Sequence, residues 1–218
     1  MPWLAVLLLL LFLPFLLALL LLNLASVSFE RLGLSADTAV LLVLGSLLGS
    51  VVNIPVWRRN VEAGPPRVDL APGLFGPILY YRPPPVREQV IALNVGGAVI
   101  PIGLSAYLLA TVAPLLSTLV VGAIVTVAAK LLSEPRPGVG VTLPALIPPV
   151  IAAGFALIVA PSNPAAAAYA GGVLGTLIGA DVLNLPAVLR FPNAVLSIGG
   201  AGIFDGIFFT GILAVLLT

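Results

Sequence analysis

Runs of about twenty apolar residues recur along the chain, and they limit its possible folds more than any other feature. Seven windows qualify: 2–24, 37–57, 90–112, 113–131, 142–160, 164–185 and 201–218. A helix needs roughly 20 apolar residues to cross the hydrocarbon core of a bilayer. The pattern therefore predicts an all-α, polytopic membrane protein with about seven transmembrane helices. The first window is interpreted as a retained helix, with a cleaved signal peptide as the alternative.

Composition agrees with this interpretation. Hydrophobic residues make up 61% of the 218 residues and charged residues 8%, whereas soluble domains carry about 25% charged residues. We expect one integral domain over residues 1–218 in a prokaryotic cytoplasmic membrane, with lipid as its surroundings. The net charge of +1 gives no reason to expect a nucleic-acid partner. The sequence does not indicate an oligomeric state.

Basic residues predict the orientation of the spans. Eight of the nine Lys and Arg residues fall in three connections, at 58–89, 130–141 and 186–200. These connections share one side of the membrane in the seven-span scheme, and only Arg31 lies on the other. Because cytoplasmic loops carry the excess of Lys and Arg, the N-terminus is predicted inside and the C-terminus outside. The 58–89 connection is a Pro-rich cytoplasmic loop in this scheme, with a short extended segment from Gly76 to Tyr81.

Two pairs of similar segments indicate an internal duplication. The segment Leu44-Gly-Ser-Leu-Leu-Gly-Ser50 matches Leu174-Gly-Thr-Leu-Ile-Gly-Ala180, and each is followed by an Asn-x-Pro motif, at Asn53 and at Asn184. A second pair begins at Gly96-Gly-Ala and at Gly199-Gly-Ala. The matching spans run in the same direction, so the pattern predicts a parallel 3+1+3 repeat with halves at about 2–112 and 142–218. The glycines spaced by four are predicted to pack helices closely.

The absence of certain residue types limits the chemistry. The chain has no Cys and no His, which excludes thiol nucleophiles, zinc sites of the Cys/His type and Ser-His dyads. No cofactor and no metal are expected. Two acids, Asp181 and Asp205, lie more than one turn inside predicted spans, where a carboxylate is costly and faces the bundle interior or water. On an ideal helical wheel Asn184 shares the face of Asp181 and is a candidate substrate-binding residue.

The expected depths of Asp181 and Asp205 in the membrane place the two aspartates close together. At about 1.5 Å per residue, Asp181 lies about 26 Å from the outer end of its span and Asp205 roughly 8 Å from the inner end of the next. Two such carboxyl groups on adjacent antiparallel helices can share one proton, one acting as general base on a water and the other as general acid on a carbonyl. Three roles stay open for the pair: catalysis, coupling of proton or cation transport, and a structural role.

Nearly the whole chain resembles a prokaryotic multi-pass family catalogued as a domain of unknown function. The segments that carry this resemblance are Leu44–Pro55, Ile91–Pro101, Pro137–Pro149, Gly171–Leu185 and Ser197–Leu217.

A second, local resemblance is to the presenilin-type intramembrane aspartyl proteases. Gly202-Ile-Phe-Asp205 is similar to their Gly-x-Gly-Asp motif, with Phe204 in place of the second glycine, and Pro144-Ala145-Leu146 is similar to their Pro-Ala-Leu motif. The Pro-Ala-Leu segment precedes both aspartates here, whereas it follows them in that family. This resemblance implies catalytic roles for Asp181 and Asp205. It also implies an active-site edge at Pro144, Ala145, Leu146 and Gly202 and a transmembrane peptide as substrate.

The predicted repeat suggests an alternative function. A parallel 3+1+3 arrangement resembles the sugar-transporting SWEET proteins, although the predicted orientation is the opposite one. In such a protein Asn53 and Asn184 would line a central path, and a small solute or a proton would be carried. A non-catalytic membrane protein is the further alternative.

Overall fold

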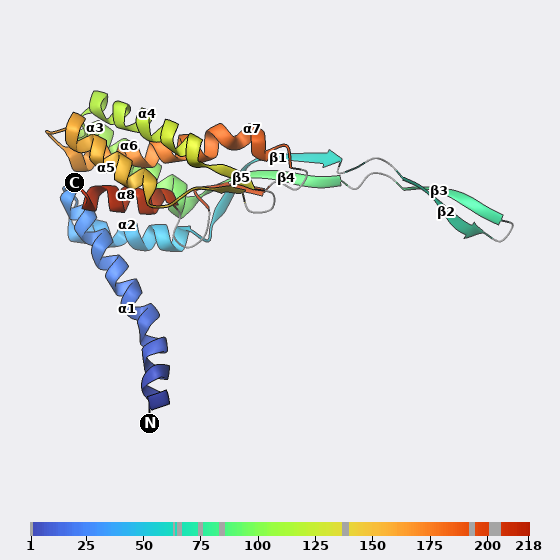
Figure 1. The fold of residues 1–218 in the computed structure, drawn as a ribbon, viewed down its shortest axis with the longest axis horizontal. Helices are drawn as coiled ribbons and strands as arrows, with labels where there is room; N and C mark the ends of the chain where they lie inside the picture. The colour runs from blue at the N-terminus through green and yellow to red at the C-terminus, as the bar shows by residue number, and fades with distance from the viewer. Residues whose placement is uncertain are drawn as a thin grey trace.

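The computed structural model describes residues 2–62, 64, 67–73, 76–82, 86–136, 140–191, 195–200 and 206–218 (Figure 1). Its helices are α1 (Pro2–Arg31), α2 (Ala36–Gly49), α3 (Ile100–Thr111), α4 (Leu115–Leu132), α5 (Ile147–Val159), α6 (Pro164–Thr176), α7 (Leu185–Val188) and α8 (Gly206–Leu216). Two π-helices, η1 (Val95–Val99) and η2 (Leu177–Asp181), and one 3-10 helix, η3 (Val182–Asn184), adjoin them. The strands are β1 (Asn53–Glu62), β2 (Arg67–Gly73), β3 (Gly76–Arg82), β4 (Val86–Asn94), β5 (Glu134–Arg136), β6 (Gly140–Thr142) and β7 (Val195–Ile198).

The expectation of an all-α protein was wrong in part, because the mostly helical chain also contains small sheets. Each of the seven apolar windows contains a helix, but several of these helices are short. Of the described residues, Leu115–Leu132 and Pro164–Val188 form helices long and apolar enough to cross a membrane, judged by length and composition alone. The second window, 37–57, is helical only as far as Gly49 and continues as strand β1. Hydropathy misses this change because an apolar strand and an apolar helix score alike.

Nearly all the described residues of the 58–89 connection form strands, and none of them is helical, as its prolines predict. Strands β1 and β4 pair antiparallel with a bulge between Pro55 and Trp57, and β2 pairs with β3 beyond them. Strand β3 contains the extended segment predicted from Gly76 to Tyr81. Together the two strand pairs form an arm that projects from the helices (Figure 1).

Strand β7 joins β4 in parallel to complete a three-stranded sheet of order β1-β4-β7. Val90 lies opposite Val195 and Leu93 opposite Ile198. The two glycine pairs of the predicted repeat, at Gly96 and Gly199, follow these two strands. The sheet therefore holds both glycine-rich segments at the same end of the helical body.

The sequence makes two local predictions about helix ends: Ser35 and Asp37 as the N-cap and first-turn acid of a helix, and the two Asn-x-Pro motifs as the ends of helices. Ser35 is the N-cap of α2, where its hydroxyl accepts the N–H of Thr38, and Asp37 lies in the first turn. The Asn-x-Pro at Asn53 follows the end of α2 as expected. The one at Asn184 does not stop the chain from coiling, because Pro186 occupies the first turn of α7, where its missing N–H costs no hydrogen bond.

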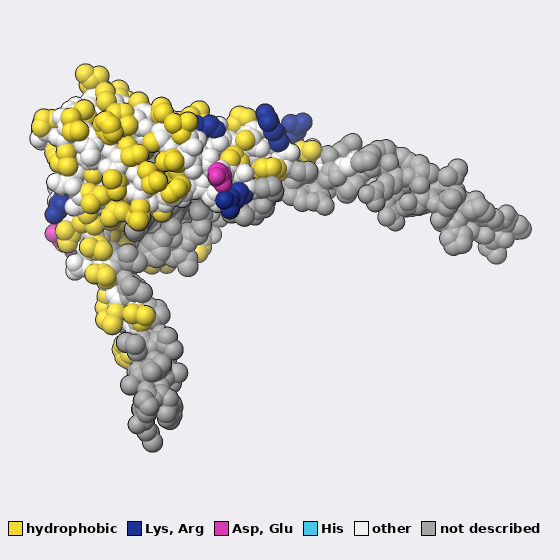
Figure 2. Space-filling model, viewed as in Figure 1, with side chains coloured by type: hydrophobic (Ala, Val, Ile, Leu, Met, Phe, Trp, Pro, Cys, Tyr) yellow, Lys and Arg dark blue, Asp and Glu magenta, His cyan; other side chains and the backbone are white. Residues whose placement is uncertain are grey.

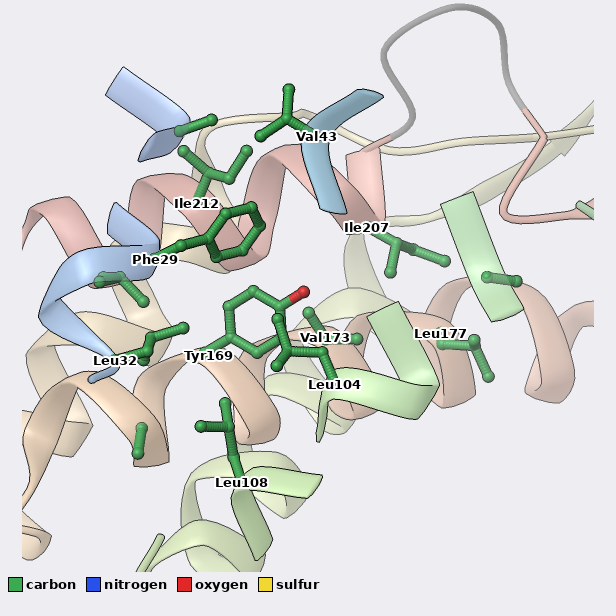
Figure 3. Close-up of a cluster of buried hydrophobic side chains, with 14 of the residues drawn as sticks. Phe29, Leu32, Val43, Leu104, Leu108, Tyr169, Val173, Leu177, Ile207 and Ile212 are labelled. Atoms are coloured by element: carbon green, nitrogen blue, oxygen red, sulfur yellow. The ribbon is translucent and has the colours of Figure 1, made fainter. Parts of the chain in front are cut away.

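Helix α6 is the central helix, and its small residues allow close packing. Gly171 and Gly175 face α4: a Cβ built on Gly171 would lie 2.8 Å from Val121 Cγ1, and one on Gly175 would lie 2.8 Å from Val125 Cβ. The predicted packing role of this glycine stripe is confirmed. On another face of α6, Tyr169 packs against Phe29 of α1 with ring centroids 6.2 Å apart (Figure 3).

The end of α1 is part of this core. Ala25, Phe29 and Leu32 are buried in the cluster around Tyr169. The Ser28 hydroxyl donates to Ile212 O, and Arg31 donates to the carbonyl oxygen of Leu216 at the end of α8. The last turns of α1 therefore fix α8 against the body.

Candidate functional site at the junction of two π-helices

Gly199 lies between the two π-helices and connects them. It follows strand β7 with φ +71°, and a Cβ built on it would lie 2.6 Å from the carbonyl carbon of Gly97 in η1. Its N–H donates to Asp181 Oδ2 in η2 at 3.1 Å. Single-turn π-helices inside α-helices occur frequently at functional sites. The meeting of two of them at one glycine marks this junction as the candidate site.

Asp181 is placed by a break in its helix. The run from Pro164 changes from α to π geometry at Leu177, reaches Asp181 as the last π-helical residue, and then tightens to a 3-10 turn. The side chain is partly exposed, and its carboxylate receives a backbone N–H, an arrangement that favours a defined orientation of the acid. This hydrogen bond joins Asp181 to the connection that precedes the seventh window.

Two asparagines hold the other side of the junction. Asn94 is 1% exposed, accepts the N–H of Gly97 at 2.8 Å and donates to Ser50 O at 2.7 Å. It also donates to Asn53 Oδ1, which in turn accepts the Ser197 hydroxyl. These bonds join the end of α2, the start of η1 and strand β7. Asn53, which would line a path in the transporter alternative, has its side-chain oxygen as an acceptor within this network.

Sequence analysis missed Asn94. An available signal was its place before Gly96 and Gly97, since Asn is a preferred residue at the start of a helix. The apolar window 90–112 concealed that start because strand β4 and the helix form one unbroken hydrophobic run.

Asn184 has its amide group engaged by neighbouring elements. It is 2% exposed, accepts Lys130 Nζ at 2.6 Å, and donates to Ala180 O and to Ser133 Oγ, each at 2.7 Å. Lys130 also donates to Leu183 O at 3.0 Å. These bonds tie the end of α4 to η3 and indicate a structural role for a residue that was predicted to bind substrate.

We expect Asn184→Ala to lower the free energy of unfolding by about 2–4 kcal/mol, because it removes several hydrogen bonds, one to a charged group, and leaves buried partners unpaired. Thermal unfolding in detergent measures the change. Asn60→Ala, at an exposed position of β1, is the matched control and should unfold like the parent. Equal melting temperatures for the two variants would contradict the structural role of Asn184.

The other predicted site residues are placed only in part. Pro144, Ala145 and Leu146 form an exposed turn before α5, and strand β6, just before them, contacts η2. Gly202 and Asp205 lie outside the described residues. In the described part of the chain no group of three or more Asp, Glu, His or Cys side chains gathers to hold a metal ion.

Together these features define a mostly helical protein with a small sheet and with helices of membrane-spanning length and composition. A network of polar contacts lies where the two π-helices meet. The chain belongs to the DUF1614 family, described as proteins of unknown function, whose model matches residues 47–217. Comparison with the curated proteins and with the solved structures finds no match. The matched region begins within α2, so it includes the sheet, both π-helices and every residue of the candidate site.

Proposed function

We propose that the protein is an intramembrane aspartyl protease that hydrolyses peptide bonds of transmembrane substrates with Asp181 and Asp205. The observation that carries the proposal is the hydrogen bond from Gly199 N–H to Asp181 at the break in its helix. Gly199 begins the connection that contains Asp205, six residues further on. The acid on one span is thus joined by a backbone hydrogen bond to the segment that supplies the second acid.

The proposed chemistry needs two carboxyl groups and one water. One carboxylate takes a proton from the water while the water oxygen forms a bond to the carbonyl carbon of the substrate. The other carboxyl group gives its proton to the carbonyl oxygen. Proton transfer to the amide nitrogen then lets the C–N bond break. The turn at Pro144–Leu146 would border the substrate, a proposal supported by the contact of β6 with η2.

A location in the cell membrane is part of the proposal. Support comes from the two helices of membrane-spanning length and from the apolar side chains exposed over the helical body, such as Leu116, Leu131 and Ile158, at 78%, 78% and 74% (Figure 2). The connections rich in Lys and Arg include β1, β4, β5 and α7, which lie at one end of the body (Figure 1). This shared end supports a cytoplasmic placement for all three connections.

Single cysteines test this orientation, because the natural chain contains none. Cysteines introduced at Val68, Gly138 and Asn193 are expected to react with a membrane-impermeant reagent only when it has access to the cytoplasmic side. A cysteine replacing Ser35, between α1 and α2, is the control and should react from outside. Labelling of any two of the first three from outside would overturn the orientation.

The protease proposal is tested with a panel of transmembrane reporter peptides in liposomes. The parent is expected to cleave some of them, and the Asp181→Asn and Asp205→Asn variants none. A parent that cleaves the whole panel no faster than both variants would refute the proposal.

A transporter is the second candidate, favoured by the parallel pairing of β4 with β7. This pairing gives the strands that precede the third and the seventh predicted spans the same direction, as a parallel repeat requires of those two spans. The equivalent glycines differ in packing, however: Gly49 contacts η1, whereas Gly179 contacts α4. Uptake of protons or small solutes into liposomes that is lost in Asp181→Asn, without any cleavage, would favour this function.

A further inference from the structure

Among the residues that the structure describes, two buried hydroxyl groups have no hydrogen-bond partner. They are Ser46 Oγ and Thr176 Oγ1, whose residues are 4% and 1% exposed. Buried polar groups are nearly always paired, so each unpaired one calls for an explanation such as a water or a functional role. The two residues also occupy equivalent positions of the repeated segment, in Leu44-Gly-Ser46 and in Leu174-Gly-Thr176. Ser46 therefore serves as a natural comparison for Thr176.

Thr176 lies on the face of α6 that packs against α8. One turn earlier, a Cβ built on Gly172 would lie 3.3 Å from Thr210 Cγ2 of α8, and Val173 Cγ2 would lie 2.9 Å from a Cβ on Gly211. Val173 points toward α8 in the close-up, with Ile207 near the beginning of that helix (Figure 3). Because α6 and α8 run antiparallel, the next turn of α6 brings Thr176 level with the start of α8.

The π-helix puts Thr176 and Asp181 on the same face. Thr176 is the N-cap residue of η2 and Asp181 is its last residue, so one i→i+5 turn separates them. In such a turn residue i+5 lies over residue i, as residue i+4 does in an α-helix. An uninterrupted α-helix would have placed Asp181 about 140° away from Thr176, at 100° per residue. The break in the helix thus aligns the unpaired hydroxyl with the carboxylate.

The spacing of this pair suits one bridging water. One turn of an α-helix rises about 5.4 Å, which we take as a guide to the π-helical turn, and two hydrogen bonds of about 2.8 Å span a similar length. Asp181 Oδ2 accepts Gly199 N–H, and a carboxylate retains further acceptor sites. A hydroxyl can donate to such a water or accept from it.

We propose that Thr176 is a positioning residue that holds the water for hydrolysis together with the Asp181 carboxylate. The inference rests on the proposed protease function and names the group that orients its nucleophile. Thr176 does not exchange protons with the substrate in this scheme. Its hydroxyl fixes the water beside the acid, so that the water is in place before a peptide enters.

Three variants of the full chain in liposomes test the inference: Thr176→Val, which keeps the shape and removes the hydroxyl, Thr176→Ser, which keeps the hydroxyl, and Ser46→Ala. We expect Thr176→Val to lower the cleavage rate at least about 10-fold, while its melting temperature stays within a few degrees of the parent value. Thr176→Ser should restore most of the rate. Ser46→Ala should cleave like the parent, because the inference gives this second hydroxyl no role in positioning the water.

Infrared difference spectra provide a readout that does not depend on cleavage. The carboxyl bands of Asp181 are assigned by their loss in Asp181→Asn. We expect them to shift in Thr176→Val and to stay in place in Ser46→Ala.

If the parent and Asp181→Asn are equally inactive, the protease function fails, and the infrared bands still decide whether Thr176 and Asp181 share a water. If Asp181→Asn is inactive while Thr176→Val cleaves normally with unmoved bands, the positioning role alone is refuted. An unfolded Thr176→Val protein would also refute it, because the hydroxyl would then be making a bond essential to the fold.

Discussion

Replacing Asp181 with Asn is expected to abolish peptide cleavage while leaving the fold intact. The Asn side-chain oxygen can still accept the N–H of Gly199, which Asp181 Oδ2 accepts at 3.1 Å. What is lost is the ability to take up and release a proton. Removal of one member of a catalytic unit typically costs roughly 10³-fold or more in rate.

The sharpest form of this experiment compares single and double variants. Because residues that act as one unit are not additive, Asp181→Asn, Asp205→Asn and the double variant should be about equally inactive. Asp181→Leu is the structural comparison, since it removes both the charge and the acceptor and should also unfold at a lower temperature. Single variants that each retain substantial activity, with a further loss in the double variant, would show that the two acids act independently.

Substituting Gly199 with Ala is expected to lower the stability of the protein strongly. The backbone φ of +71° costs an alanine about 1–2 kcal/mol, and its Cβ would lie 2.6 Å from the carbonyl carbon of Gly97. Overpacking of this kind costs typically 1–3 kcal/mol, so we expect a total loss of about 2–5 kcal/mol. For a chain of this size the melting temperature should fall by roughly 4–20 °C.

Two other glycines provide matched controls. Gly103 in α3 and Gly154 in α5 are exposed and have no atom within 4 Å of a built Cβ. Ala at either position should leave stability unchanged or raise it by up to about 1 kcal/mol, because Ala favours helix over Gly. If Gly199→Ala melts at the same temperature as Gly154→Ala, the two π-helices do not approach each other as described.

The sequence by itself determined where helices form and which glycines pack. Apolar windows located each long helix, because hydrophobic length is a property of the local sequence. Ser35 was identifiable as a cap, and the glycine stripe of α6 as a packing surface, because both depend on neighbours within a few residues. Asp181 stood out as an acid in an apolar run for the same reason.

Only the tertiary structure decided how the windows divide and which residues meet. Strand β1 pairs with residues 24 to 41 positions away, and strands β4 and β7 pair residues 105 positions apart, which no local pattern encodes. The use of Asn53, Asn94 and Asn184 as hydrogen-bonding partners likewise depends on distant segments.

The side of the helix on which Asp181 lies is the clearest example of a feature that only the tertiary structure decided. An ideal α-helix would place it about 140° away from Thr176, whereas the π-helix places it over Thr176. Such a break costs hydrogen-bond geometry within the helix and is kept only where neighbours stabilise it, here the Gly199 N–H. The presence of an acid in an apolar span is therefore evident from the sequence, whereas its direction depends on how the glycine-rich segments at Gly96 and Gly199 pack.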